Sequence, residues 1–266
     1  MEFATEQVVY FSPTKTTLKI VDAVAEGLGL KSVSRVDLTF PSKNEAIEDA
    51  GDLAVIGVPV YSGRVPDLAV KRLRKHVQGK GRPAVLVVVY GNRAYDDALL
   101  ELRNLAEELG FVPVAAGAFI GEHSFSTPEL PVVPGYPTES HVEKARHFGA
   151  GVIEKMQAVE SLGQMGELQV PGNFPYRDGA PVSTVSPKTR AEECTHCGEC
   201  ARMCPSQAIT VTETAVETEP SACIWCSACI RACPSGGRYW DVPRVHEINV
   251  FLHENHADPK EPETFL

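Results

Sequence analysis

The chain has 266 residues, of which 43% are hydrophobic and 23% are charged, and its formal net charge at pH 7 is −10. This length suggests two domains rather than one. The negative charge argues against nucleic acid and against an anionic membrane surface as binding partners. No apolar stretch approaches the roughly 20 residues that a membrane-spanning helix needs.

Short apolar runs alternate with segments of helical periodicity between residues 6 and 160. The run PAVLVVVY at 83–90 is continuous and rich in β-branched residues, which is typical of a strand buried on both faces. Strands interleaved with helices predict a doubly wound α/β domain, a five-stranded parallel sheet with helices on both faces. The expected strands are 7–11, 32–38, 52–58, 83–90 and 112–120, and the expected helices are 16–28, 67–77, 96–109 and 138–162.

The first expected strand leads into a loop that is rich in hydroxyl groups and opens a helix. Hydroxyls, backbone N–H groups and the helix dipole converge there, which suits a phosphate group. Neither a Walker loop nor a dinucleotide-binding fingerprint is present. The alternative is that Ser12 and Thr14 only cap the helix. The candidate residues of this loop are Ser12, Thr14, Lys15, Thr16 and Thr17.

Two further loops follow the third and fourth expected strands. Ligands of doubly wound sheets bind at the carboxyl ends of the strands, so these loops should lie close to the first one. A single tyrosine in such a loop is most often structural, but Tyr61 and Tyr95 on adjacent strands describe a slot for a planar ring. The candidate residues are Pro59, Val60, Tyr61, Ser62 and Gly63 in one loop, and Tyr90, Gly91, Asn92 and Tyr95 in the other.

The last third of the chain contains all eight cysteines. Residues 164–189 are rich in proline and glycine and have no periodicity, which predicts a linker between the domains. Two cysteine runs follow, and each reads C-x2-C-x2-C-x3-C-P, the spacing that binds a pair of [4Fe–4S] clusters. Because the fourth cysteine of a run reaches the other cluster, the expected ligand sets are Cys194, Cys197, Cys200 with Cys233, and Cys223, Cys226, Cys229 with Cys204.

Zinc and disulfide bonds are the alternatives for these cysteines. Zinc sites usually use two cysteine pairs separated by a longer segment, and disulfides suit small secreted chains. Residues 1–5 do not resemble a signal peptide, so we expect a cytoplasmic protein. Between the two runs, residues 210–219 alternate valine with threonine and glutamate, which predicts a short hairpin. Residues 241–266 are expected to form a C-terminal helix and tail.

Residues 6 to about 162 resemble flavodoxins, whose first loop reads [ST]-x-T-G-x-T. Ser12, Thr14 and Thr17 fall on its hydroxyl positions, and Lys15 takes the place of the glycine. Residues 190–240 resemble two-cluster bacterial ferredoxins. Together with the stretch GNRAYDDALLEL and the ending EPETFL, these features make the whole chain similar to the flavodoxin–ferredoxin fusion family found mainly in anaerobes.

The resemblance implies a flavodoxin-like FMN-binding domain at 1–163, a linker at 164–189 and a small α+β dicluster ferredoxin-like domain at 190–240. It implies that the first loop binds the FMN phosphate and that Tyr61 is the aromatic of the second loop. It also implies that Tyr95 stacks on the isoalloxazine and that Gly91 and Asn92 touch its pyrimidine edge.

The function expected from these features is electron transfer between redox partner proteins through FMN and two [4Fe–4S] clusters. The partners would dock through electrostatics, and a homodimer is a further possibility. One alternative is a flavin-dependent reductase that acts on a quinone or nitroaromatic and is fed by its own clusters. Another is a domain without FMN that only docks the ferredoxin part.

Overall fold

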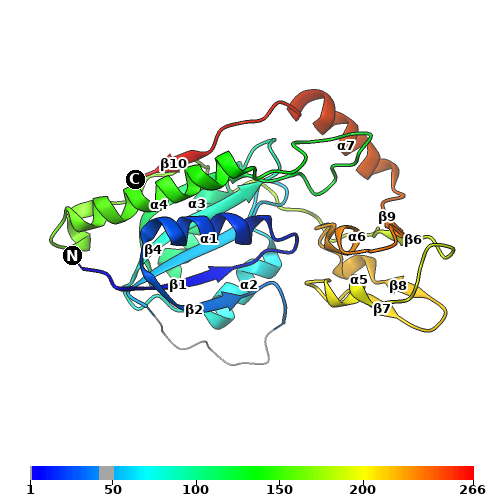
Figure 1. Cartoon of the computed structure of the whole chain (residues 1–266), viewed down its shortest axis with the longest axis horizontal. Coiled ribbons are helices and arrows are strands. Elements are labelled where there is room, and N and C mark those ends of the chain that lie inside the picture. The colour runs from blue at the N-terminus through cyan, green and yellow to red at the C-terminus, as the bar shows by residue number, and fades with distance from the viewer. Residues whose placement is uncertain (1, 42–50) are drawn as a thin grey trace.

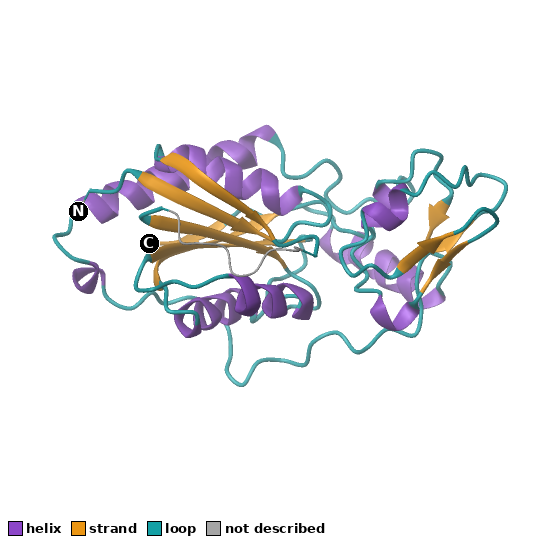
Figure 2. Cartoon of the chain, turned by 90° about the horizontal axis from the view of Figure 1, so that it is seen from below, coloured by secondary structure: helices purple, strands orange, loops and turns teal. Residues whose placement is uncertain are grey.

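The computed structural model describes residues 2–41 and 51–266 and has two parts (Figure 1). The larger part is a sheet between two layers of helices, and the smaller part, which carries the cysteines, lies at one end of the sheet (Figure 2). The strand order β10-β5-β4-β3-β1-β2 contains the flavodoxin-like order 2-1-3-4-5. Its strands are β1 (Thr5–Tyr10), β2 (Lys31–Asp37), β3 (Leu53–Pro59), β4 (Pro83–Tyr90), β5 (Val112–Ile120) and β10 (Glu263–Phe265).

The five strands β1 to β5 are parallel, as the sequence predicts. Every residue of β3 and β4 is buried, because helices cover both faces of the sheet. One apolar core lies between the sheet and α1 and α4, and the other between the sheet and α2 and α3. These helices are α1 (Thr16–Leu28), α2 (Asp67–His76), α3 (Ala98–Glu108) and α4 (Glu139–Gln157).

The smaller part is built from short elements around the cysteines. The predicted hairpin is present as the antiparallel pair β7 and β8. A second antiparallel pair, β6 with β9, joins the end of the linker to the chain after the last cysteine. The elements are β6 (Lys188–Thr189), α5 (Glu199–Arg202), β7 (Ile209–Val211), β8 (Val216–Thr218), η2 (Pro220–Ala222), α6 (Ala228–Arg231) and β9 (Arg238–Tyr239), whereas η1 (Leu162–Met165) packs on the larger domain after α4.

The chain returns to the larger domain after the cysteines. Helix α7 (Pro243–His256) leads back, and β10 pairs antiparallel with β5, so the expected tail is a sixth strand of the sheet (Figure 1). The side chain of Asn92, in the loop after β4, holds this segment. Its Nδ2 donates to the carbonyl oxygens of His256 and Asp258, and its Oδ1 accepts from the backbone N–H of Lys260.

The predicted linker runs along α3 and is hydrogen-bonded to it. The carboxylate of Asp97 accepts from the backbone N–H groups of Asn173 (2.8 Å) and Arg177 (2.7 Å). Arg103 donates to the carbonyl oxygen of Leu168 (3.0 Å). These bonds limit how far the smaller domain can move from the sheet. Within the described part of the chain, no helix is long and apolar enough to cross a membrane.

Glu6 of β1 makes the stability of the larger domain depend on pH. Its side chain is 2% exposed and its Oε2 has no hydrogen-bond partner among the described residues. Burial raises the pKa of Glu6 from its usual 4.5 to about 7, although Arg35 opposes the shift. The folded protein therefore binds a proton that the unfolded chain has released between pH 4.5 and 7, so stability falls as the pH rises through this range.

We expect Glu6→Gln to remove this fall and to raise the free energy of unfolding at pH 8 by on the order of 2 kcal/mol. Urea unfolding at pH 5 and pH 8 measures the effect. Glu2 is exposed, so Glu2→Gln is the matched control and should leave the free energies of unfolding at pH 5 and pH 8 unchanged. A wild-type protein as stable at pH 8 as at pH 5, with no gain in Glu6→Gln, would contradict the expectation.

Candidate functional site

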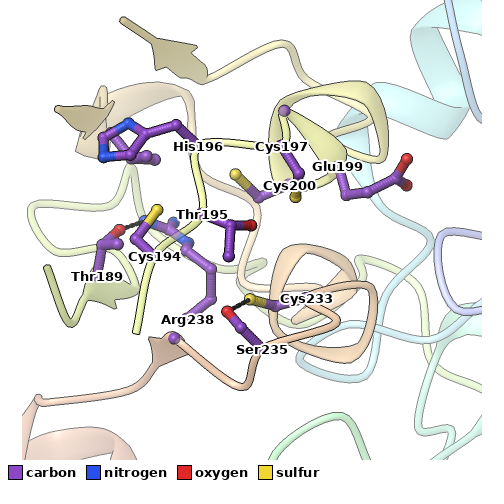
Figure 3. Close-up of a pocket in the computed structure, with 13 residues that line it drawn as sticks. Thr189, Cys194, Thr195, His196, Cys197, Glu199, Cys200, Cys233, Ser235 and Arg238 are labelled. Carbon is purple, nitrogen blue, oxygen red and sulfur yellow. Dashed lines mark hydrogen bonds between the residues drawn. The ribbon is translucent and has the colours of Figure 1, made fainter. Parts of the chain in front are cut away.

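The first cysteine set lines a cavity in the smaller domain whose empty space, part of it open to solvent, is about 320 Å³ (Figure 3). Cys194 and Cys197 come from the loop before α5, Cys200 from α5 itself, and Cys233 from the turn after α6. The structure therefore brings together the four cysteines that the spacing predicts for one cluster, three from one run and the last from the other. Cys197 is exposed, so this cavity lies near the protein surface.

The second cysteine set lines another cavity of about the same volume. Cys223, Cys226 and Cys229 come from the second run, and Cys204 comes from the end of the first. Cys226 and Cys229 are buried, unlike Cys197 of the first set. The two sets therefore differ in the exposure of individual cysteines, although the ligand pattern around both cavities is the same.

The geometry of both sets fits a cluster. In the described residues, no three His, Cys, Asp or Glu side chains approach closely enough to hold a single metal ion. Each set of four cysteines lines an open space, into which a polynuclear cluster with cysteine ligands would fit. Burial raises the pKa of the Cys200 and Cys229 thiols, and the positive charge of Arg238 opposes this rise in both.

The loop between β1 and α1 forms a turn that fits a phosphate. Lys15 has the left-handed conformation (φ 65°) immediately before α1, so it adopts the backbone that the glycine of the flavodoxin pattern would provide. Ser12 Oγ accepts from the backbone N–H of Leu18 (3.0 Å), and the hydroxyls of Thr14 and Thr16 contact each other (3.3 Å). Thr17 Oγ1 is buried and has no partner among the described residues. A ligand oxygen would satisfy it.

The loop after β3 places Tyr61 between the two domains. Tyr61 and Arg64 exchange two backbone hydrogen bonds across Ser62 (φ 53°) and Gly63 (φ 78°), which makes a tight turn with two left-handed central residues. Burial raises the pKa of Tyr61 well above its usual value, and the neighbouring Cys226 raises it further. The phenol of Tyr61 is therefore near enough to the second cysteine set to be affected by its charge. Pro59 ends β3, and the N–H of Val60 donates to the carbonyl oxygen of Val89.

The loop after β4 holds other residues that the resemblance assigns to FMN. Tyr95 packs edge-on against Tyr90 (5.4 Å between ring centroids), and its hydroxyl donates to Glu263 of β10. All three hydrogen bonds of the Asn92 side chain go to the C-terminal segment. The backbone of Gly91 lies against the ring of His123, where any Cβ atom would clash. The structure thus uses these side chains for internal contacts, and their roles toward a flavin stay predictions.

The two domains meet at the carboxyl edge of the sheet. Arg72 of α2 donates to the carbonyl oxygen of Pro205, the residue after Cys204 (2.7 Å). Arg231 of α6 donates to the carbonyl oxygen of His123 (3.0 Å) and forms an ion pair with Glu122 (3.2 Å). The second cavity therefore faces the loops that are expected to bind FMN.

Aromatic side chains fill part of the same interface. Phe125, in the loop after β5, packs against Trp225 and Trp240 at centroid distances of 6.1 and 5.7 Å. Trp225 stands between Cys223 and Cys226 in the sequence. Apolar rings thus pack together where the loop after β5 meets the cysteine domain, and burial is one property that tunes a cluster's reduction potential.

Two residues at the site were not predicted as functional. His123 is surrounded by protein and by the positive charges of Arg231 and Arg93, and burial with these charges lowers its pKa to about 4. Its Nδ1 accepts from the backbone N–H of Phe125 (3.1 Å), so the neutral ring carries its proton on Nε2. The second residue is Arg238, which lies between the cavities. Nothing local in the sequence distinguishes Arg238 from the surface arginines of the chain.

Comparisons with known proteins match the two parts of the chain separately. Residues 193–237 match the family described as 4Fe-4S dicluster domain, so the chain contains an iron–sulfur cluster domain. No curated protein matches the chain.

Several solved structures resemble part of the chain. A flavodoxin from the domain Archaea is 13% identical, with a TM-score of 0.39 over 57% of this chain and 99% of that one. Oxidised Flavodoxin 1 from Bacillus cereus is 16% identical, with a TM-score of 0.42 over 57% and 98%. Rubredoxin oxygen:oxidoreductase from Desulfovibrio gigas is 15% identical, with a TM-score of 0.40 over 58% of this chain and 36% of that one.

Proposed function

We propose that the chain is an electron-transfer flavoprotein that binds FMN and two [4Fe–4S] clusters and carries low-potential electrons between redox partners. The observation that carries this proposal is the position of the second cysteine set against the carboxyl edge of the sheet. Doubly wound sheets with this strand order bind ligands at the switch point between β1 and β3, which is where flavodoxins hold FMN. Tyr61 follows β3, and hydrogen bonds from Arg72 and Arg231 join the two domains at this edge, so we expect the flavin and cluster sites to adjoin.

The residues that would hold the cofactors have distinct tasks. The loop that contains Thr17 would bind the phosphate through hydroxyls and backbone N–H groups, and Tyr61 would form one wall of the ring site. The cysteine sets around Cys197 and Cys226 would bind one cluster each. A [4Fe–4S] cluster accepts one electron at a time and FMN accepts one or two, so the chain would link one-electron and two-electron partners.

The first test of this proposal is the cofactor content of protein purified without oxygen. We expect about eight irons, about eight sulfides and about one FMN per chain. A stepwise reductive titration, followed by absorbance and EPR, should show the flavin and the clusters reduced in coupled steps. A full complement of iron without flavin, even after incubation with FMN, would reduce the first domain to a docking scaffold and sink the FMN part of the proposal.

Thr17→Val gives a specific test of the phosphate site. The Thr17 hydroxyl is buried without a described partner, so its replacement by a methyl group should not lower the stability of the protein without FMN. It should weaken FMN binding by about tenfold to a hundredfold, because a hydrogen bond to a charged phosphate is lost.

Fluorescence titration of flavin-free protein with FMN measures the affinity. Thr17→Ser keeps the hydroxyl and is the matched control, so its affinity should stay close to that of the wild type. Equal FMN affinity in Thr17→Val and wild type would show that the Thr17 hydroxyl does not bind the FMN phosphate.

We further propose that the partners are redox proteins with basic docking surfaces, and that the protein works in the cytoplasm of an anaerobic cell. The net charge of −10 supports the first point, because opposite charges speed association at low salt. The exposed Cys197 makes the first cavity the accessible entry point. A partner-dependent reduction rate that does not fall as salt increases would argue against electrostatic docking. Sedimentation at micromolar concentration tests the proposed homodimer.

A further inference from the structure

Arg238 of β9 is a buried cation between the two cysteine sets. It is 3% exposed. Its Nη1 donates to Thr189 Oγ1 (2.8 Å), and its Nη2 donates to Thr218 Oγ1 (2.9 Å) and lies 3.7 Å from Cys229 Sγ. Its Nε has no hydrogen-bond partner among residues 2–41 and 51–266. The hydrogen-bond partners of the guanidinium are therefore two neutral hydroxyls and one cysteine sulfur.

This arrangement touches both cavities. Arg238 lines the cavity of the first set, together with Cys194, Cys200 and Cys233 (Figure 3). Cys229, which its guanidinium approaches, belongs to the second set. One positive charge therefore lies against both sites at once.

A buried cation that only neutral groups contact is unstable unless negative charge lies nearby. The two hydroxyls satisfy N–H groups but do not neutralise the charge. Thiolate-ligated clusters carry net negative charge, so two of them on either side of the guanidinium would provide the missing compensation. The two negative clusters would therefore stabilise the buried positive charge of Arg238.

We propose that Arg238 raises the reduction potentials of both clusters, because its positive charge and its N–H groups lie close to both cysteine sets. A cluster that accepts one electron from a mediator or partner protein becomes more negative by one charge, so its attraction to the guanidinium increases. Donor hydrogen bonds and positive charge near the sulfurs therefore favour the reduced form. This inference rests on the two-cluster part of the proposed function and does not depend on FMN.

A measurement on the unmodified protein tests the contact directly. Protein whose arginines carry ¹⁵N only in the guanidinium group is purified without oxygen, reduced with dithionite and studied by pulsed EPR. Arg238 should give ¹⁵N hyperfine couplings to the paramagnetic clusters, and these should vanish in labelled Arg238→Lys. Absence of any arginine ¹⁵N coupling in the wild type would overturn the inference. Absence of iron and of the EPR signal itself would instead contradict the proposed function.

Variants test the effect on the potentials. In Arg238→Gln, EPR-monitored redox titration should show that the equilibrium constant for reducing each cluster is at least about tenfold lower, which for one electron is about 59 mV per tenfold. Arg238→Lys keeps the charge and should stay within about threefold of the wild type. Iron and sulfide analysis accompanies each titration, so that loss of a cluster is not mistaken for a shift.

Arg202→Gln is the matched control, because it removes one positive charge from the same domain at an exposed position paired with Glu199. Water screens that charge, so we expect less than about a threefold change. Unchanged potentials in fully loaded Arg238→Gln, or an equal shift in Arg202→Gln, would overturn the inference. If Arg238→Gln does not retain its clusters, the labelled wild type decides the question.

Discussion

Cys233→Ser is expected to remove the cluster that Cys194, Cys197 and Cys200 bind, and to leave the cluster of its own run in place. The iron content should fall from about eight to about four per chain. The reason is that Cys233 lines the first cavity although it belongs to the second cysteine run. A serine hydroxyl is a poor substitute for a thiolate ligand, so the cavity loses one of its four ligands.

Pairs of variants identify which cluster is lost. The EPR spectrum of reduced Cys233→Ser should equal that of Cys194→Ser, because both variants lack the first cluster. Likewise, the EPR spectrum of reduced Cys204→Ser should equal that of Cys226→Ser, because both variants lack the second cluster. If Cys233→Ser instead gave the spectrum of Cys226→Ser, each run would bind its own cluster and the crossed pattern would be wrong.

Asn92→Ala is expected to lower the free energy of unfolding of the larger domain by on the order of 3 kcal/mol. Asn92 is 0% exposed, and its amide makes three hydrogen bonds to the segment that leads into β10. Their loss removes three partly buried hydrogen bonds that hold this segment to the loop after β4, which costs about 1–3 kcal/mol. The left-handed conformation of Asn92 (φ 66°) adds about 1 kcal/mol for alanine.

Urea unfolding followed by circular dichroism measures this effect, and limited proteolysis shows whether the segment after α7 is released. Asn92→Gly is the matched control, because it loses the same hydrogen bonds without the backbone strain, and it should fall between the wild type and Asn92→Ala. Glu261→Ala removes an exposed ion pair with Lys144 in the same segment and should change stability by less than about 1 kcal/mol. Wild-type stability in both Asn92 variants would show that the C-terminal segment is not held by this side chain.

The sequence predicts most of the fold, because its periodicity is long and regular there. The run at 83–90 coincides with β4, and the run at 112–120 coincides with β5. The cysteine sets are likewise predictable, since their spacing alone limits which sulfurs can surround one cluster.

The rest of the site depends on contacts between residues far apart in the chain. The three residues of β10 are too few to show periodicity, and their partner strand lies about 140 residues earlier. Asn92 and Tyr95 hold the C-terminal segment across 164 and 168 residues, so no local pattern in the sequence predicts these contacts. Arg238 has no local pattern either, because its importance comes from two cavities that form only when both cysteine runs fold together.

The late position of β10 in the chain has a consequence for how the protein is made. About 140 residues separate β5 from the strand that covers its edge, and they include both cysteine runs. At roughly 5–20 residues per second, the ribosome needs on the order of 7–30 s to bridge that interval. During this time the apolar edge of β5 lacks its neighbour and can pair with other nascent chains. Because both cysteine runs emerge before β10, the chain can form its cysteine sets while this edge of the sheet is still uncovered.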